Sequence, residues 1–174
     1  MRRQRIGILG GTFNPIHFGH LQSAEKAGDI LQLDRVIFIP SGIPPHKDTS
    51  NLVDGIDRYR MVALAVMDRD TFCVSPMEID RPGYSYTHDT LLRLRMKLGK
   101  KVDLFFLLGS DMVSGLPEWQ GYPEILSLAS FHLMPRYNGI SSTIIRRDRR
   151  QGKAVYSYVP FKVGEYIMKK GLYS

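Results

Sequence analysis

The feature that most constrains the fold is the alternation of short apolar runs with segments whose apolar residues recur at the helix period. Apolar runs rich in Val, Ile and Phe predict strands, and apolar residues three or four positions apart predict helices. The expected strands are 5–9, 36–39, 72–74, 102–108 and 131–134, and the expected helices are 17–31, 56–67, 88–98, a loop and helix over 118–129, 142–150 and one opened by Pro160. This alternation predicts a doubly wound α/β fold, with helices on both faces of a parallel sheet and 102–108 as its buried central strand.

Length and composition fit one globular domain, which we expect to span 1–174. Of the 174 residues, 43% are hydrophobic and 24% charged, an ordinary balance for a chain with a real core. The single cysteine, Cys73, excludes an internal disulfide, and its apolar run 71–74 favours a packed core thiol over a nucleophile. No apolar stretch approaches the roughly 20 residues that cross a bilayer. The basic start 1–5 is not followed by the apolar segment of a signal peptide, so we expect a cytoplasmic protein without a membrane partner.

The charge balance predicts a polyanionic partner. The formal net charge is +7, and such a surface attracts nucleotides and nucleic acids alike. Basic residues are spread along the chain except for the pairs at 146–147 and 149–150. Charge alone therefore leaves a free nucleotide and a nucleic acid equally open.

The segment from Gly10 to His20, between the first expected strand and helix, has the features of a phosphate site. Gly10 and Gly11 allow a ligand to approach the backbone at the end of a strand, where parallel sheets bind ligands. His17 and His20 share a face of the first helical turn, whose free N–H groups carry partial positive charge. Gly19 keeps that surface low enough for a phosphate. The alternatives are a tight turn with two surface histidines, or a zinc pair, which needs two further ligands that no other spacing provides.

A second candidate phosphate site lies near the other end of the chain. Ser141, Ser142 and Thr143 stand at the start of an expected helix, and Arg146 lies one turn inside it. Hydroxyls, free N–H groups and a guanidinium can together hold phosphate oxygens. Taken alone, the pattern is better explained as a helix cap followed by a solvated basic helix.

Together these segments resemble the HxGH and ISSTxxR motifs of the HxGH nucleotidyltransferase superfamily. The resemblance implies a Rossmann-like fold, with both histidines on the ATP phosphates and the second motif on the β- and γ-phosphates. The implied ATP-binding residues are Gly10, Gly11, Thr12, Phe13, His17, His20, Gly109, Asp111, Ser142, Thr143 and Arg146.

Further stretches over nearly the whole chain resemble the bacterial nicotinate-nucleotide adenylyltransferases. They are 11–17, Pro44-Pro45-His46-Lys47, 85–91, 108–111, Leu116-Pro117 with Trp119, and Val159-Pro160. The implied residues for nicotinate mononucleotide are Ser41, His46, Lys47, Thr87, Trp119 and Arg136, and the implied catalytic residues are His17, His20, Lys47 and Arg146.

Several of these residues have an ordinary structural explanation as well. Trp119 can stack on a nicotinate ring or pack in the core, and Thr87 can meet the nicotinate carboxylate or only cap a helix. Lys47 and Arg136 can bind the mononucleotide phosphate or face solvent. Asp111 can contact a ribose, as the family implies, or form a turn.

The resemblance departs from the family pattern at two places. Family members usually carry a longer segment with another strand before the second motif, whereas only 135–139 intervene here. Either the chain has a deletion or a segment is missing from the sequence, which leaves the role of Arg136 and the edge of the sheet open. Ser41 replaces an asparagine that is frequent in relatives.

The resulting prediction is an enzyme of NAD biosynthesis that transfers AMP from ATP to nicotinate mononucleotide, giving deamido-NAD and pyrophosphate. Mg²⁺ is expected to enter with ATP, held largely by substrate and water, with no metal site of the protein's own. The alternatives are a pantetheine-phosphate adenylyltransferase, a basic nucleic-acid-binding module and a nucleotide sensor without turnover. We expect ATP and nicotinate mononucleotide as partners and no nucleic acid, with assembly into a homo-oligomer left open.

Overall fold

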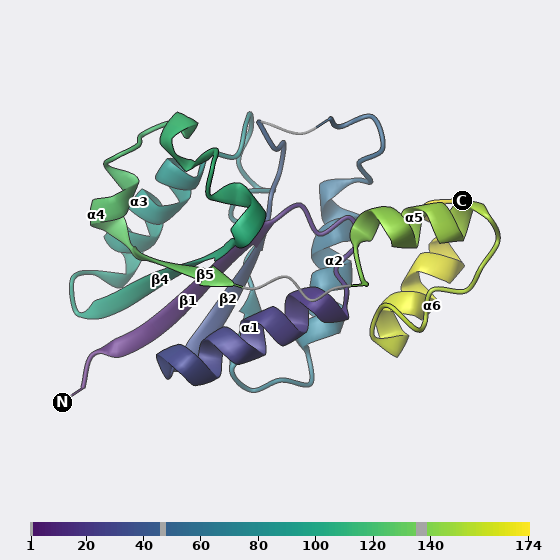
Figure 1. Ribbon diagram of the computed structural model, residues 1–174, viewed down its shortest axis with the longest axis horizontal. Helices are drawn as coiled ribbons and strands as arrows, with labels where there is room; N and C mark the ends of the chain where they lie inside the picture. Colours follow the sequence, from purple (N-terminus) through teal and green to yellow (C-terminus); the bar gives the residue numbers. More distant parts are fainter. Residues whose placement is uncertain (1, 46–47, 135–138) are drawn as a thin grey trace.

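The computed structural model describes residues 2–45, 48–134 and 139–174, apart from the side chain of Asp111, and contains a five-stranded sheet in the order β3-β2-β1-β4-β5 (Figure 1). Every adjacent pair of strands is parallel. The strands are β1 (Gln4–Gly11), β2 (Arg35–Pro40), β3 (Phe72–Val74), β4 (Val102–Gly109) and β5 (Ser130–Met134). The predicted parallel α/β architecture is therefore confirmed.

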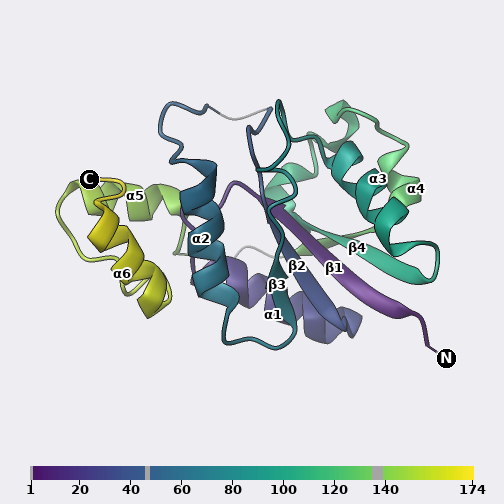
Figure 2. The ribbon, with the colours of Figure 1, turned by 180° about the vertical axis from the view of Figure 1, so that it is seen from behind.

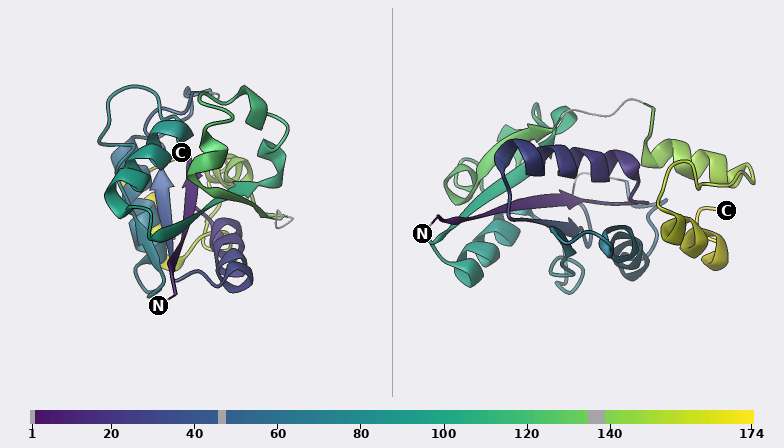
Figure 3. Two further views of the ribbon diagram at one scale, coloured as in Figure 1. Left: turned by 90° about the vertical axis from the view of Figure 1, so that its left-hand side faces the viewer. Right: turned by 90° about the horizontal axis from the view of Figure 1, so that it is seen from below.

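Helices follow the strands as the sequence predicts. They are α1 (Phe18–Leu31), α2 (Gly55–Val66), α3 (Thr87–Leu98), α4 (Ile125–Leu128), α5 (Ser142–Arg150) and α6 (Phe161–Lys170), with 3₁₀ turns η1 (Ser110–Met112) and η2 (Leu116–Glu118). Helices α1 and α3 lie on opposite sides of the sheet (Figure 3). Helices α5 and α6 lie beside α2 and away from α3 and α4 (Figure 2).

Two cores form because successive strand residues point to opposite faces of the sheet. On one face, Leu9, Phe38 and Leu107 pack in a cluster with buried residues of α1, α2 and α6. On the other face, Ile8 and Phe106 pack with buried residues of α3 and α4. Both faces of the sheet are therefore covered by apolar side chains, so groups that bind a polar ligand must lie at the ends of the strands.

Three local expectations are wrong in detail. The strand 102–108 is buried as predicted, but β1 is the centre of the sheet and β4 lies between β1 and the edge strand β5. Tyr86, rather than a serine or threonine, caps α3 without a side-chain hydrogen bond, because the Ser85 hydroxyl instead accepts from Gly42 N–H at 2.9 Å. Pro160 is the residue before α6 rather than its first residue.

No helix within the described residues is long and apolar enough to cross a membrane.

Candidate active site

The two motif segments, from opposite ends of the chain, touch each other directly. The Ser142 hydroxyl donates to the carbonyl oxygen of Pro15 at 2.8 Å, and Nη1 of Arg146 donates to that of Asn14, also at 2.8 Å. The first segment follows β1, and the second forms the start of α5. The two segments that the resemblance assigns to the phosphates of ATP therefore meet in space.

A cavity of about 980 Å³ opens at this junction, beyond the carboxyl ends of the strands. The predicted residues that line it are Gly10, Gly11, Thr12, Phe13, His17, His20, Ser41, Thr87, Gly109, Trp119, Ser142, Thr143 and Arg146. The structure thus gathers the two predicted binding sets into one cavity. His46, Lys47 and Arg136, together with the side chain of Asp111, lie outside the described residues.

His17 and His20 are held as a stacked pair at the start of α1. Their ring centroids lie 3.7 Å apart, and the edge of His20 meets Phe13 at 5.1 Å. The backbone N–H of His17, the residue that precedes α1, donates to Nδ1 of His20 at 3.2 Å. Since Nδ1 accepts, neutral His20 carries its proton on Nε2.

The protonation state of His17, which the sequence left open, follows from its environment. His17 is buried, and burial lowers its pKa to about 4. Its buried Nδ1 has no hydrogen-bond partner among the described residues. At neutral pH the ring is therefore uncharged and donates only one hydrogen bond.

Gly19 has a structural role beyond the one expected of it. A Cβ atom at Gly19 would lie 3.0 Å from Nδ1 and 3.1 Å from Cε1 of His17. The glycine therefore makes room for the histidine ring itself. The free N–H groups expected at the start of α1 are also partly occupied, because Phe18 N–H donates to the carbonyl of Tyr158 at 2.9 Å.

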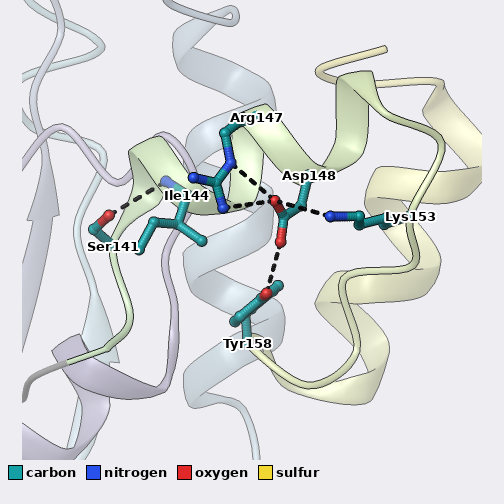
Figure 4. Close-up of polar contacts among 6 residues, drawn as sticks. All are labelled: Ser141, Ile144, Arg147, Asp148, Lys153 and Tyr158. Atoms are coloured by element: carbon teal, nitrogen blue, oxygen red, sulfur yellow. Dashed lines mark hydrogen bonds and ion pairs between the residues drawn. The ribbon is translucent and has the colours of Figure 1, made fainter.

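Ser141 caps α5, so the second motif also supports its own helix. Its hydroxyl accepts from Ile144 N–H at 3.2 Å (Figure 4). Ser141 also lines the cavity, as do Ser142 and Thr143 in the first turn of the helix. The structural reading and the functional one are thus compatible within the same motif, since the residue that caps the helix also lies at the cavity.

Asp148 joins the far end of α5 to the segment before α6. Its buried carboxylate accepts from the Tyr158 hydroxyl at 2.7 Å and from Arg147 Nη2 at 2.9 Å, and Lys153 Nζ lies 3.8 Å away (Figure 4). The hydrogen bond from Tyr158, followed by that from Arg147, lowers the pKa of Asp148. Since the carbonyl of Tyr158 also binds Phe18, this contact indirectly connects α5 to the start of α1.

Sequence reasoning missed Arg58, which holds together the two connections that follow β1 and β2 beside the cavity. Its guanidinium is buried and donates to the carbonyl oxygens of Thr12, Ser41, Gly42 and Val53 at 2.6–3.0 Å. A signal was available, because Arg58 lies three and seven residues before Met61 and Ala65 on the buried face of α2. An arginine on an apolar stripe needs internal acceptors.

Asn14 and Tyr173 were also missed. The Tyr173 hydroxyl donates to Oδ1 of Asn14 at 2.9 Å, and Nδ2 of Asn14 donates to the carbonyl of Asn51 at 2.8 Å. Desolvation raises the pKa of Tyr173. Tyr173 lies far from Asn14 in the chain, so sequence spacing gave no signal of this contact.

The other end of the cavity is more apolar. Trp119 is half-buried, packs edge-on against Phe106 with 6.1 Å between centroids, and lines the cavity, so both predicted roles remain available to it. Thr87 is the first residue of α3. Nearby, buried Glu78 accepts from the Thr90 hydroxyl at 2.6 Å, and burial raises its pKa. Nothing in the sequence around Glu78 marked it as a residue of the cavity.

Within the described residues, no group of three or more His, Cys, Asp and Glu side chains could hold a metal ion. The side chains that surround the junction of the two motifs are mainly histidines, hydroxyls and an arginine. This donor set suits phosphate oxygens rather than a bare divalent cation.

Comparison with known proteins matches both motif segments. The cytidylyltransferase-like family matches residues 8–148. A nicotinate-nucleotide adenylyltransferase from Halalkalibacterium halodurans is 39% identical over 191 residues, covering 98% of this chain and 91% of the relative. One from Thermus thermophilus is 41% identical, covering 97% of this chain and 99% of the relative. The first alignment exceeds the 174 residues of this chain, so that relative has residues without a counterpart here.

Solved structures agree on the fold. A nicotinate-nucleotide adenylyltransferase structure from Vibrio parahaemolyticus has a TM-score of 0.81 at 24% identity and covers 98% of this chain and 95% of its own. The Plasmodium falciparum nicotinic acid mononucleotide adenylyltransferase complexed with NaAD has a TM-score of 0.74 at 19% identity, with 98% and 97% covered. With curated relatives matched over almost their whole length, the chain belongs to the cytidylyltransferase-like family and is a nucleotidyltransferase of its nicotinate-nucleotide adenylyltransferase branch.

Proposed function

We propose that the chain joins ATP and nicotinate mononucleotide in this cavity to give deamido-NAD and pyrophosphate. The observation that carries the proposal is the contact of Ser142 with Pro15 and of Arg146 with Asn14, which brings two phosphate-binding segments to one place. The cavity volume of about 980 Å³ lies at the upper end of the range of about 300–1,000 Å³ that is usual for small-molecule sites, as a site for nucleotides requires.

The reaction is a single displacement at phosphorus. A phosphate oxygen of nicotinate mononucleotide attacks the α-phosphorus of ATP, the bond from that phosphorus to the bridging oxygen breaks, and pyrophosphate leaves. No covalent intermediate with the protein is needed, so the protein contributes positioning and charge stabilisation.

At the phosphate end, we assign different roles to the two kinds of donor. His17 and His20 supply hydrogen bonds from rings that are preorganised by their stacking. His17 is uncharged in the ligand-free protein, so Arg146 would provide the positive charge that first meets the triphosphate. Nη1 of Arg146 donates to Asn14 and Nη2 donates to Oγ1 of Thr143 at 3.5 Å, so the remaining N–H groups of the guanidinium are the ones that would be offered to the β- and γ-phosphates.

At the other end, Thr87 and Trp119 would receive the pyridine nucleotide. Trp119 offers an indole face to a flat nicotinate ring, and the start of α3 offers backbone N–H groups to its carboxylate. Ser41 and Gly109, at or just after the ends of β2 and β4, lie on the same cavity wall. Roles for Lys47, His46, Arg136 and Asp111 remain part of this proposal.

Mg²⁺ would enter as the MgATP complex, as part of the substrate. Hydroxyls of Ser142 and Thr143 line the cavity beside Arg146, whereas Mg²⁺ prefers carboxylate, phosphate and water oxygens. Substrate phosphates and water would therefore hold most of its coordination sphere.

The test is incubation of the protein with MgATP and, in separate reactions, nicotinate mononucleotide, nicotinamide mononucleotide and phosphopantetheine. Pyrophosphate and the dinucleotide product are measured. We expect fastest release with nicotinate mononucleotide. Turnover only with phosphopantetheine would identify the chain as a pantetheine-phosphate adenylyltransferase instead. ATP binding without any release of pyrophosphate would contradict the proposal that the chain is an enzyme.

A further inference from the structure

A contact outside the cavity connects α3 to residues 119–124, the loop that carries Trp119 and is called the Trp119 loop below. The His88 ring lies between two carboxylates, with Nδ1 3.3 Å from Oδ1 of Asp89 and Nε2 3.1 Å from Oε2 of Glu124. The second contact is a close approach without hydrogen-bond alignment, because the buried Nε2 has no hydrogen-bond partner among the described residues. Asp89 in turn lies 3.6 Å from Nη1 of Arg81. His88 directly follows Thr87, and Glu124 directly precedes α4, so the contact spans from the start of one helix to the start of another.

A second observation places the same loop against the same ring. A Cβ atom at Gly121 would lie 2.6 Å from Cδ2 and Cγ of His88, so the loop backbone rests directly on the imidazole. Gly121 also has φ of +79°, which other residues rarely adopt. Gly121 therefore lets the loop backbone lie against the His88 ring of α3, where a residue with a side chain would not fit.

The contacts of His88 with Gly121 and Glu124 lie within one turn of Trp119. The carbonyl of Trp119 accepts from Tyr122 N–H at 3.0 Å, and the carbonyl of Gly121 accepts from Ile125 N–H at 3.1 Å. Ile125 is fully buried in the core under α3. The loop is thus held by the buried side chain of Ile125 and by the ring of His88. The indole of Trp119 packs against Phe106, and both residues line the cavity.

We propose that His88 and Glu124 form a positioning pair that fixes the Trp119 loop relative to Thr87 and so sets the width of the pyridine-nucleotide end of the cavity. The consequence for binding rests on the proposed function, whereas the placement of the loop does not. Neither side chain lines the cavity, so the pair acts through Trp119 and not on the substrate.

The chain provides its own probe, because Trp119 is its only tryptophan. Acrylamide quenching of Trp119 fluorescence is measured without ligands in the wild type, His88→Ala, Glu124→Gln and the double variant. We expect each single change to increase the quenching constant, by about 1.5- to 3-fold since one partner is exposed. The double variant should add little to His88→Ala, because the pair is then already broken.

Glu25→Gln is the matched control, since it removes a similarly exposed pair with Arg69 at 3.0 Å, far along the chain from Trp119. Quenching should not change in this variant. Glu124 is 63% exposed, so Glu124→Gln keeps the test available even where His88→Ala folds poorly. Unchanged quenching in Glu124→Gln, or additive effects in the double variant, would overturn the positioning pair.

Binding and kinetics then test the consequence. Glu124→Gln should raise KM for nicotinate mononucleotide about two- to fivefold and leave KM for ATP and kcat within about 1.5-fold of the wild type. Equal rises in both KM values would contradict a role at one end of the cavity. Failure of the wild type to use nicotinate mononucleotide would count against the proposed function. The ligand-free quenching result would still show whether His88 and Glu124 position the Trp119 loop.

Discussion

His17 illustrates how single residues prepare this site, because its ring lies between His20 and Gly19 at the edge of the cavity. It stacks on His20, and its Nδ1 faces Gly19, where even one carbon atom would come within 3.0 Å. Burial keeps the ring neutral through a pKa of about 4. Its contribution to catalysis therefore depends on position, and small displacements should be costly.

Gly19→Ala tests this dependence, and Gly28→Ala in the same helix is its control. A Cβ at Gly28 meets nothing within 4 Å, so this change should stabilise the protein by about 0.5–1 kcal/mol with no effect on turnover. Gly19→Ala gains the same helix propensity but must displace the His17 ring, so we expect kcat to fall about 10- to 100-fold. Thermal unfolding and steady-state kinetics of both variants are compared. Normal turnover in Gly19→Ala would show that the ring position is not critical.

At the level of elements, hydrophobic periodicity and glycine placement were sufficient to predict every strand and the longer helices, because these depend on local patterns of burial. The residues that sequence reasoning missed serve contacts between elements. Arg58 binds carbonyls of two separate loops, and Tyr173 reaches Asn14 from the far end of the chain. A side chain whose partners are backbone atoms far along the sequence leaves no periodic signal.

Helix α5 is fastened through Asp148, and this makes part of the stability pH-dependent. The hydrogen bond from Tyr158 depresses the pKa of Asp148 in the folded state. A depressed pKa means that the contribution is fully present above the unfolded value of about 3.9 and is lost as pH falls through the lower folded value. Asp148→Asn should therefore be less stable than the wild type at pH 7, and the gap should narrow below about pH 4.

Urea unfolding of both proteins at pH 7, 5 and 3 measures this gap. Asp68→Asn is the control, because Asp68 is 72% exposed in its pair with Lys162 and should contribute little at any pH. A gap between wild type and Asp148→Asn that is as wide at pH 3 as at pH 7 would mean that the charge of Asp148 is not what stabilises α5.

For the whole molecule, the central property is that one cavity is built from both ends of the chain. Residues 10–20 follow the middle strand of the sheet, whereas 140–146 and Tyr173 belong to the α5–α6 unit beside α2 (Figure 2). A ligand that contacts both segments must stabilise both of them against local unfolding, because it binds only the arrangement in which they touch.

Hydrogen exchange measured by mass spectrometry tests this coupling. MgATP should slow exchange about tenfold in peptides covering both 12–20 and 141–150, whereas nicotinate mononucleotide alone should act mainly around Thr87 and the Trp119 loop. Ser142→Ala removes the bond to Pro15 but keeps the helix, so protection by MgATP should weaken in 12–20 more than in 141–150. Protection confined to one segment in the wild type would mean that the two motifs do not share a triphosphate, since a single bound ATP cannot order one side of its phosphate chain and leave the other unchanged.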